Sequence, residues 1–233
     1  MSEIYLDNAA TTPCDPKVLK AMEPFWSKIY GNPSSFNDVG RKAKKAIDQS
    51  RQKIARTLGA KNQEIIFTSS ATEANNLAIL GTIKSLKNKG SKIVTTRIEH
   101  QSVLEPVKKL EKEGIKVHYL SVNKEGLIDL NEFKKALTPD VLLISIIYTN
   151  NEIGSIQPIK KISKIIKEFR NSKFEIRDSS YPYFHIDAAQ AANHLDINVN
   201  NLGVDLMTIS SHKIYGPKEL PACISEEELK LSL

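Results

Sequence analysis

A lysine close to the end of the sequence follows two hydroxyl residues and a histidine. Lys213 lies in the segment Ser-Ser-His-Lys-Ile-Tyr-Gly-Pro-Lys at 210–218. A lysine amine can form a Schiff base with an aldehyde cofactor such as pyridoxal 5′-phosphate (PLP), and hydroxyl and imidazole groups can hold the cofactor's phosphate. A lysine in such a loop is by itself more often a surface residue, so this interpretation depends on the rest of the chain.

Small and hydroxyl residues follow the first apolar run of strand type. The run at 65–68 is followed by Ser-Ser-Ala-Thr-Glu at 69–73 and then by a helical pattern at 74–86. A strand-to-helix turn leaves backbone N–H groups free, and the start of a helix attracts phosphate. An ordinary helix cap explains Ser or Thr at these positions equally well.

A histidine follows the next apolar run, at 92–96. His100 could stack on a cofactor ring and move a proton, because imidazole is the side chain best suited to titrate near neutrality. A lone histidine after a strand is more often structural, and that alternative stays open.

An aspartate closes the apolar run at 183–187. Burying the Asp187 carboxylate is costly unless a positive group pairs with it, and a protonated pyridine nitrogen is such a group. Gln190 could then hydrogen-bond the phenolic oxygen of the same ring. The alternative is that Asp187 caps a helix that starts at Ala188.

Short β-branched runs recur along the chain, and segments of helical spacing separate them. This alternation predicts an α/β layered domain with a mostly parallel sheet, in which ligands bind at the carboxyl ends of the strands. The predicted strands are 65–68, 92–96, 117–120, 141–148, 183–187 and 205–209.

Local signals place several other elements. Asp15 and Pro16 are typical of a helix start, and the turn residues at 31–35 should stop that helix. Apolar residues at helical spacing predict a long helix that reaches Leu58. The polar stretch at 169–182 is expected to be a surface loop.

The composition is that of an ordinary water-soluble domain. The 233 residues carry a net charge of +6 and are 40% hydrophobic. The densest basic stretch, 41–45, lies within a helical pattern and is better explained as a solvated face than as a nucleic-acid contact. No signal peptide and no apolar run of about 20 residues is visible, so we expect a cytoplasmic protein without a membrane span. Two distant cysteines predict neither a disulfide framework nor a metal cluster.

Several motifs, taken in order, resemble those of cysteine desulfurases, PLP enzymes of the class V aminotransferase group. The resemblance runs from the N-terminus to about Lys218. Its motifs are Tyr-Leu-Asp-Asn-Ala-Ala-Thr-Thr-Pro at 5–13, Gly-Asn-Pro-Ser-Ser at 31–35, Ala-Thr-Glu-Ala-Asn-Asn-Leu-Ala at 71–78, Asn-Asn-Glu-Ile-Gly at 150–154, and the 210–218 segment.

This resemblance implies a homodimer of the type I PLP fold. Its three-layer large, PLP-binding domain would span 16–218, after an N-terminal arm at 1–15. Lys213 would carry the cofactor and move protons, and His100 would stack on the ring as acid and base. The other implied contacts to the cofactor are Asp187 to the pyridine nitrogen, Gln190 to the phenolic oxygen, Asn151 beside the ring, and Ala71, Thr72, Ser210 and His212 at the phosphate.

The implied reaction converts L-cysteine to L-alanine and transfers the sulfur to a protein cysteine. The sulfur would pass to an acceptor protein, either a scaffold for iron–sulfur clusters or a carrier for tRNA thiolation. Two alternatives stay open. One is a different class V activity, such as selenocysteine lyase or aminotransferase. The other is a catalytically silent fragment that binds PLP.

The pattern departs from the family after Lys218. Glu219 occupies the position of an expected glycine, and Pro221 argues against a central strand. Residues 219–233 are therefore expected to be a divergent tail. The family's small C-terminal domain, with its catalytic cysteine and substrate-binding arginine, is expected to be missing. Neither Cys14 nor Cys223 is a convincing substitute, so we expect little or no desulfurase activity from these residues.

Overall fold

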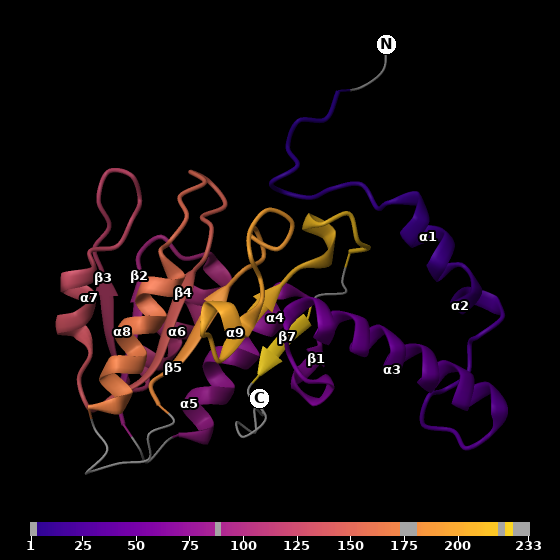
Figure 1. Ribbon diagram of the computed structural model, residues 1–233, viewed down its shortest axis with the longest axis horizontal. Helices are drawn as coiled ribbons and strands as arrows, with labels where there is room; N and C mark the ends of the chain where they lie inside the picture. The colour runs from indigo at the N-terminus through magenta and orange to yellow at the C-terminus, as the bar shows by residue number, and fades with distance from the viewer. Residues whose placement is uncertain (1–3, 87–89, 173–180, 219–221, 226–233) are drawn as a thin grey trace.

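A seven-stranded sheet forms the centre of the molecule (Figure 1). The computed structural model describes residues 4–86, 90–172, 181–218 and 222–225. The strand order is β1-β7-β6-β5-β4-β2-β3. The strands are β1 (Ile65–Phe67), β2 (Lys92–Thr96), β3 (Lys116–Leu120), β4 (Val141–Ile147), β5 (Tyr183–Asp187), β6 (Leu206–Ile209) and β7 (Ala222–Ser225).

Five of these strands run parallel. The pairs β6–β5, β5–β4, β4–β2 and β2–β3 are all parallel, whereas β7 is antiparallel to both β6 and β1. Every residue of β4 is buried, as expected for a strand that is covered on both faces. The prediction of an α/β domain with a mostly parallel sheet is confirmed, and each predicted strand is present within one residue of its expected ends.

Helical segments connect the strands and begin at residues that suit a helix start. Asp15 caps α1 by accepting the N–H of Lys17, and Asn37 caps α3 by accepting that of Gly40. The segments are α1 (Pro16–Met22), α2 (Pro24–Ser27), α3 (Asp38–Leu58), α4 (Ala71–Asn76), a π turn (Leu77–Gly81), α5 (Thr82–Ser85), α6 (Gln101–Lys112), α7 (Leu130–Ala136), α8 (Ile159–Asn171) and α9 (Val199–Leu202), with short 3-10 turns at Asn62–Glu64 and Ser211–Lys213.

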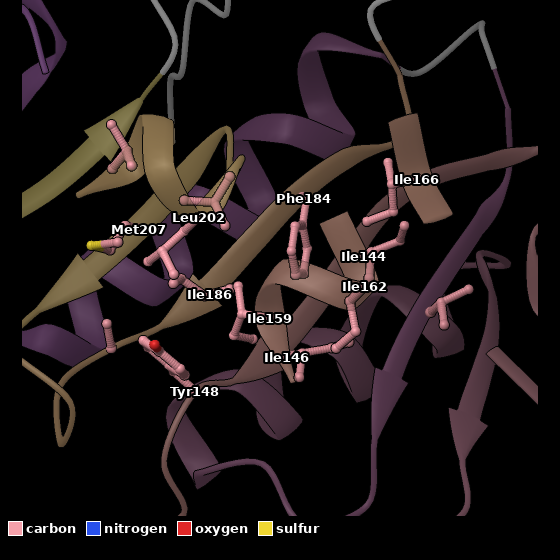
Figure 2. Close-up of a cluster of buried hydrophobic side chains, with 14 of the residues drawn as sticks. Ile144, Ile146, Tyr148, Ile159, Ile162, Ile166, Phe184, Ile186, Leu202 and Met207 are labelled. Atoms are coloured by element: carbon pink, nitrogen blue, oxygen red, sulfur yellow. The ribbon is translucent and has the colours of Figure 1, made fainter. Parts of the chain in front are cut away.

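One face of the sheet packs against α8, together with α7, α9 and the end of α3. Figure 2 shows Ile159, Ile162 and Ile166 of α8 lying against side chains of β4 and β5, among them Ile144 and Phe184. Burial of this apolar stripe stabilises both elements, at about 25 cal/mol per Å² of apolar surface removed from water.

The opposite face of the sheet packs against α4, α5 and α6. Ala74, Ala78 and Ile83 meet Val103 and Val107 over the second set of strand side chains. Side chains of successive strand residues point to opposite faces, so β5 contributes Tyr183 to this layer and Phe184 to the other. Helices on both faces of one sheet give the expected three layers.

The expectation that residues 219–225 would not form a central strand is wrong. β7 pairs with β6 through Cys223 and Thr208, and with β1 through Cys223 and Ile66. Position 221 lies outside the described residues and precedes the ladder. A proline there removes no N–H from the paired positions 222–225, so the rule against proline in central strands does not apply.

The polar stretch at 169–182 is partly helical rather than a loop throughout. α8 continues through Asn171, and β5 begins at Tyr183. The rest of the expected loop, at 173–180, lies outside the described residues. The turn residues at 31–35 follow a second short helix, α2, because α1 already ends at Met22.

The N-terminal elements carry many of the exposed apolar side chains of the described surface. Trp26, Tyr30 and Phe36 are largely exposed. In Figure 1, α1 and α2 lie at the end of the molecule opposite to β3 and α7. Within the described part of the chain, no helix is long and apolar enough to cross a membrane.

We predict that Phe184→Ala will strongly destabilise the protein. Phe184 of β5 is 0% exposed where β5 packs against α8. Truncation of a buried phenylalanine typically costs about 3–5 kcal/mol. Phe36→Ala is the matched control, because Phe36 is 94% exposed and its loss should change stability by less than about 0.5 kcal/mol. Urea unfolding followed by far-UV circular dichroism measures both. Equal effects of the two substitutions would contradict the packing described above.

Candidate active site

A cavity of about 510 Å³ opens at the carboxyl ends of the parallel strands. This is the edge where open α/β sheets bind ligands. All nine residues that the sequence predicted for the site line this cavity: Ala71, Thr72, His100, Asn151, Asp187, Gln190, Ser210, His212 and Lys213. The topology therefore brings together side chains that are up to 142 positions apart, from 71 to 213.

The loop that carries Lys213 is fixed by the N-terminal arm. The N–H and the hydroxyl of Thr12 both donate to the carbonyl of His212, at 2.8 and 3.0 Å. The same hydroxyl oxygen accepts the N–H of Tyr215 at 2.8 Å. Tyr215 has a φ of 61°, a left-handed conformation that is unfavourable for a residue other than glycine. The bonds from Thr12 hold the loop in this conformation.

The Lys213 side chain is half-buried, and its surroundings favour the neutral amine. Loss of solvent lowers the pKa of Lys213, while the negative charge of Asp187 opposes that shift. Only a neutral amine is nucleophilic, so a lowered pKa makes Lys213 a better nucleophile at a given pH.

The Asp187 carboxylate is almost fully buried at the end of β5, with 4% of the residue exposed. Its Oδ1 accepts a hydrogen bond from the N–H of Ala189 at 3.0 Å, and its Oδ2 accepts one from Asn75 Nδ2 at 2.8 Å. The alternative that Asp187 caps a helix is wrong, because residues 189–194 form turns rather than a helix. The bond to Ala189 belongs to such a turn.

His100 caps α6 and lies at the rim of the cavity. Its Nδ1 accepts the N–H of Ser102 at 3.1 Å and lies 2.7 Å from Ser102 Oγ. Ser102 Oγ is in turn 2.8 Å from Asn75 Nδ2. His100 therefore does two things. It caps a helix, which is a structural role, and it lines the cavity, as the sequence predicted.

Three buried polar residues of this region were not predicted as site residues. Asn75 and Ser102 link Asp187 to His100, and Glu99 lies directly before His100. Asn75 lies within the motif at 71–78. Its hydrogen bond to Asp187 joins residues 112 positions apart, so no local sequence pattern predicts it. A buried glutamate in a turn looks the same in sequence as a solvated one.

Glu99 is an acid buried beneath the cavity, with 5% of the residue exposed. Its Oε1 accepts the hydroxyl of Thr96 at 2.7 Å and the N–H of Ile147 at 2.9 Å. Desolvation raises the pKa of Glu99 to about 8 despite these hydrogen bonds, and the charge of Asp187 adds to the shift. Glu99 is therefore mostly protonated at neutral pH.

The remaining lining residues present polar groups toward the cavity. Ser210 is buried, and its Oγ has no hydrogen-bond partner within the described part of the chain. Burial lowers the pKa of His212, and the positive charges of Lys213 and Lys218 contribute to the shift. Gln190 Nε2 donates to the carbonyl of Ala9 in the arm at 2.9 Å. The described residues contain no group of three or more potential metal ligands.

The fold and the position of the cavity define the large domain of a PLP-dependent transferase. The chain belongs to the aminotransferase class-V family, whose sequence profile matches residues 4–231. Members of this family use PLP. This family agrees with the class that the sheet and its cavity indicate.

Individual relatives are cysteine desulfurases by name. The chain is 48% identical to the cysteine desulfurase IscS of Dictyoglomus turgidum, over 98% of this chain and 55% of the relative. It is 47% identical to the mitochondrial cysteine desulfurase of Candida albicans, over 94% of this chain and 43% of the relative. A solved structure of a NifS-like protein superposes with a TM-score of 0.92 at 34% identity, over 99% of this chain and 61% of that one. The chain thus spans about half the length of the curated relatives it matches.

We predict that Glu99→Gln will become more stabilising relative to wild type as the pH rises from 5 to 8. In this window native Glu99 keeps a proton that the unfolded chain, with a pKa near 4.5, releases, so wild-type stability falls as the pH rises. Glutamine carries no such proton, and the gain should be on the order of a few kcal/mol. Urea unfolding at pH 5, 6.5 and 8 measures the difference.

The control for this experiment is Glu125→Gln, which removes a carboxyl group from an exposed turn. It makes the same change from glutamate to glutamine at an exposed side chain, so it controls for the chemistry of the substitution itself. A difference between Glu99→Gln and wild type that stays constant across the pH range would contradict the buried, protonated state of Glu99.

Proposed function

We propose that the cavity binds PLP and that the protein uses it as a cysteine desulfurase does. The observation that carries this proposal is the pairing of an amine and a carboxylate in one cavity. Lys213 has a lowered pKa, and the buried Asp187 is close enough to influence that pKa. The sequence identity to cysteine desulfurases supports the same conclusion.

The chemistry of the lining residues fits PLP. The amine of Lys213 would bind the aldehyde carbon, and the carboxylate of Asp187 would keep a pyridine nitrogen protonated. Ser210 Oγ lies buried without a partner among the described residues, as expected of a group that awaits an acceptor such as phosphate. Ala71, Thr72 and His212 line the same cavity and would bind the phosphate with it.

The other lining residues would orient the ring and the substrate. His100 would stack on the ring and exchange a proton through Nε2, the nitrogen that the helix cap does not use. Asn151 would lie beside the ring. Gln190 would donate to the phenolic oxygen through the second N–H of Nε2, since one N–H of that group donates to the Ala9 carbonyl.

The proposed reaction moves sulfur from L-cysteine to a thiol. When bound, PLP withdraws electrons from the amino acid attached to it, which allows the carbon–sulfur bond to break. The amine of Lys213 would move the proton that the substrate carbon loses and regains. The thiol takes the sulfur as a persulfide, and L-alanine leaves, so that atoms and electrons balance without an external oxidant.

The thiol that receives the sulfur is not among the described residues that line the cavity. Cys14 is the free cysteine whose side chain the structure describes, and it lines a separate hollow beside Tyr5 and Gly216. We therefore propose that the sulfur leaves to a thiol from outside this lining. A homodimer, a scaffold or tRNA-thiolation carrier as acceptor, and a cytoplasmic location stay predictions. One relative is mitochondrial by name.

We predict that the protein will bind PLP through Lys213. Mixing the purified protein with PLP should produce a visible absorption band, and borohydride reduction should leave the cofactor attached to the peptide that contains Lys213. Lys213→Ala should lose both signals, although Lys218 lines the same cavity. Lys20→Ala, which removes an exposed lysine of α1, should retain them.

The mass of the labelled peptide separates specific from accidental attachment. Attachment to exposed lysines at a similar level in wild type and Lys213→Ala would contradict the assignment of Lys213. Retention of the band in Lys213→Ala would contradict it as well.

We predict slow, Lys213-dependent formation of L-alanine from L-cysteine, which an added small thiol will accelerate. The added thiol would accept the sulfur in place of a cysteine, which the described lining of the cavity does not contain. Alanine and persulfide can be measured by mass spectrometry with PLP-loaded wild type and Lys213→Ala. Transfer of the amino group to a 2-oxo acid, without alanine from L-cysteine, would instead support an aminotransferase.

A further inference from the structure

A continuous row of hydrogen bonds joins Asp187 to His100 beneath the cavity. Asn75 Nδ2 lies 2.8 Å from Asp187 Oδ2 and 2.8 Å from Ser102 Oγ. Ser102 Oγ lies 2.7 Å from His100 Nδ1. Asn75, at the centre of the row, is fully buried, and Ser102 is 6% exposed.

The orientation of the Asn75 amide follows from the carboxylate. A carboxylate offers only acceptors, so the atom of Asn75 that faces Asp187 Oδ2 must be the NH₂ nitrogen. The opposite orientation would place two oxygen acceptors 2.8 Å apart, and would bury both N–H groups where the structure describes no acceptor. Asn75 Oδ1 has no partner among the described residues, and leaving one acceptor unpaired is the smaller cost.

The direction of the next bond follows from the count of protons. One N–H of Asn75 goes to Asp187 and the other goes to Ser102 Oγ, which therefore acts as acceptor there. The single hydroxyl proton of Ser102 is then free to donate to His100 Nδ1. The backbone N–H of Ser102 donates to the same nitrogen at 3.1 Å. Two donors on Nδ1 leave the ring proton of neutral His100 on Nε2.

We propose that Asn75 and Ser102 are positioning residues that hold His100 as its Nε2–H tautomer in response to the charge of Asp187. The outer nitrogen of His100 then presents a proton rather than a lone pair. The catalytic use of that proton rests on the proposed function, whereas the tautomer is a property of this chain without cofactor. The proposal makes His100 sensitive to a residue that it does not contact.

This sensitivity gives a specific result for Asp187→Asn. The substitution places an amide nitrogen where Oδ2 was, so the new donor faces Asn75. Asn75 can then turn its oxygen toward both the new amide and the hydroxyl of Ser102. The hydroxyl of Ser102 then no longer donates to His100 Nδ1. That nitrogen keeps only the hydrogen bond from the backbone N–H of Ser102.

Nitrogen-15 NMR of the cofactor-free protein tests the proposal. The chain has five histidines, and His100→Gln identifies the ring signals of His100. We expect the wild-type Nδ1 signal at an acceptor frequency and a proton on Nε2. Ser102→Ala should shift Nδ1 toward the frequency of a less hydrogen-bonded nitrogen, and Asp187→Asn should shift it in the same direction. Ser102→Thr, which keeps the hydroxyl, should restore the wild-type signal.

The double variant distinguishes a relay from general disturbance. In the Ser102→Ala background, Asp187→Asn should cause no further shift of His100 Nδ1, because the connecting hydroxyl is already gone. Additive shifts, or a proton on Nδ1 in the wild type, would overturn the proposal. Dispersed amide spectra confirm that each variant folds. Because PLP is not added, failure of this test is distinct from failure of PLP binding.

Discussion

The buried carboxylate of Asp187 is the interaction on which the arrangement of the site depends. An acidic group at the end of a central strand is costly to bury unless its oxygens are paired. The N–H of Ala189 and the amide of Asn75 supply that pairing, and the amide comes from the helical layer over the sheet. The carboxylate thus links β5 to α4. Through Asn75 it also sets the orientation of the Ser102 hydroxyl.

The same charge organises the acids and bases around it. It opposes the desolvation that lowers the pKa of Lys213, and it helps to keep Glu99 protonated. A second negative charge on Glu99 would lie in the same buried region. The protein avoids this because desolvation keeps Glu99 protonated despite its hydrogen bonds from Thr96 and Ile147, so that Asp187 is the acid that faces the cavity.

The sequence predicted the sheet well because its parallel strands are short, apolar and bounded by polar turns. Asp187 was predicted because a charge that closes an apolar run is costly to bury without a partner, and Lys213 because two hydroxyl residues and a histidine precede it. Asn75 and Ser102 were not, because their roles exist only once α4 and α6 pack together. β7 was missed because a rule about proline within strands was applied to position 221, which precedes the strand.

The N-terminal arm shows why the position of Lys213 could not be derived from its own loop. The loop contains a left-handed Tyr215, a conformation that local sequence disfavours. Thr12 compensates with bonds to His212 and Tyr215, and the N–H of Asp15 donates to the Tyr215 carbonyl at 2.9 Å. The loop of Lys213 therefore depends on a segment two hundred residues away, as Asp187 depends on Asn75. In both cases a residue remote in sequence fixes the geometry of a residue that the motif alone identifies.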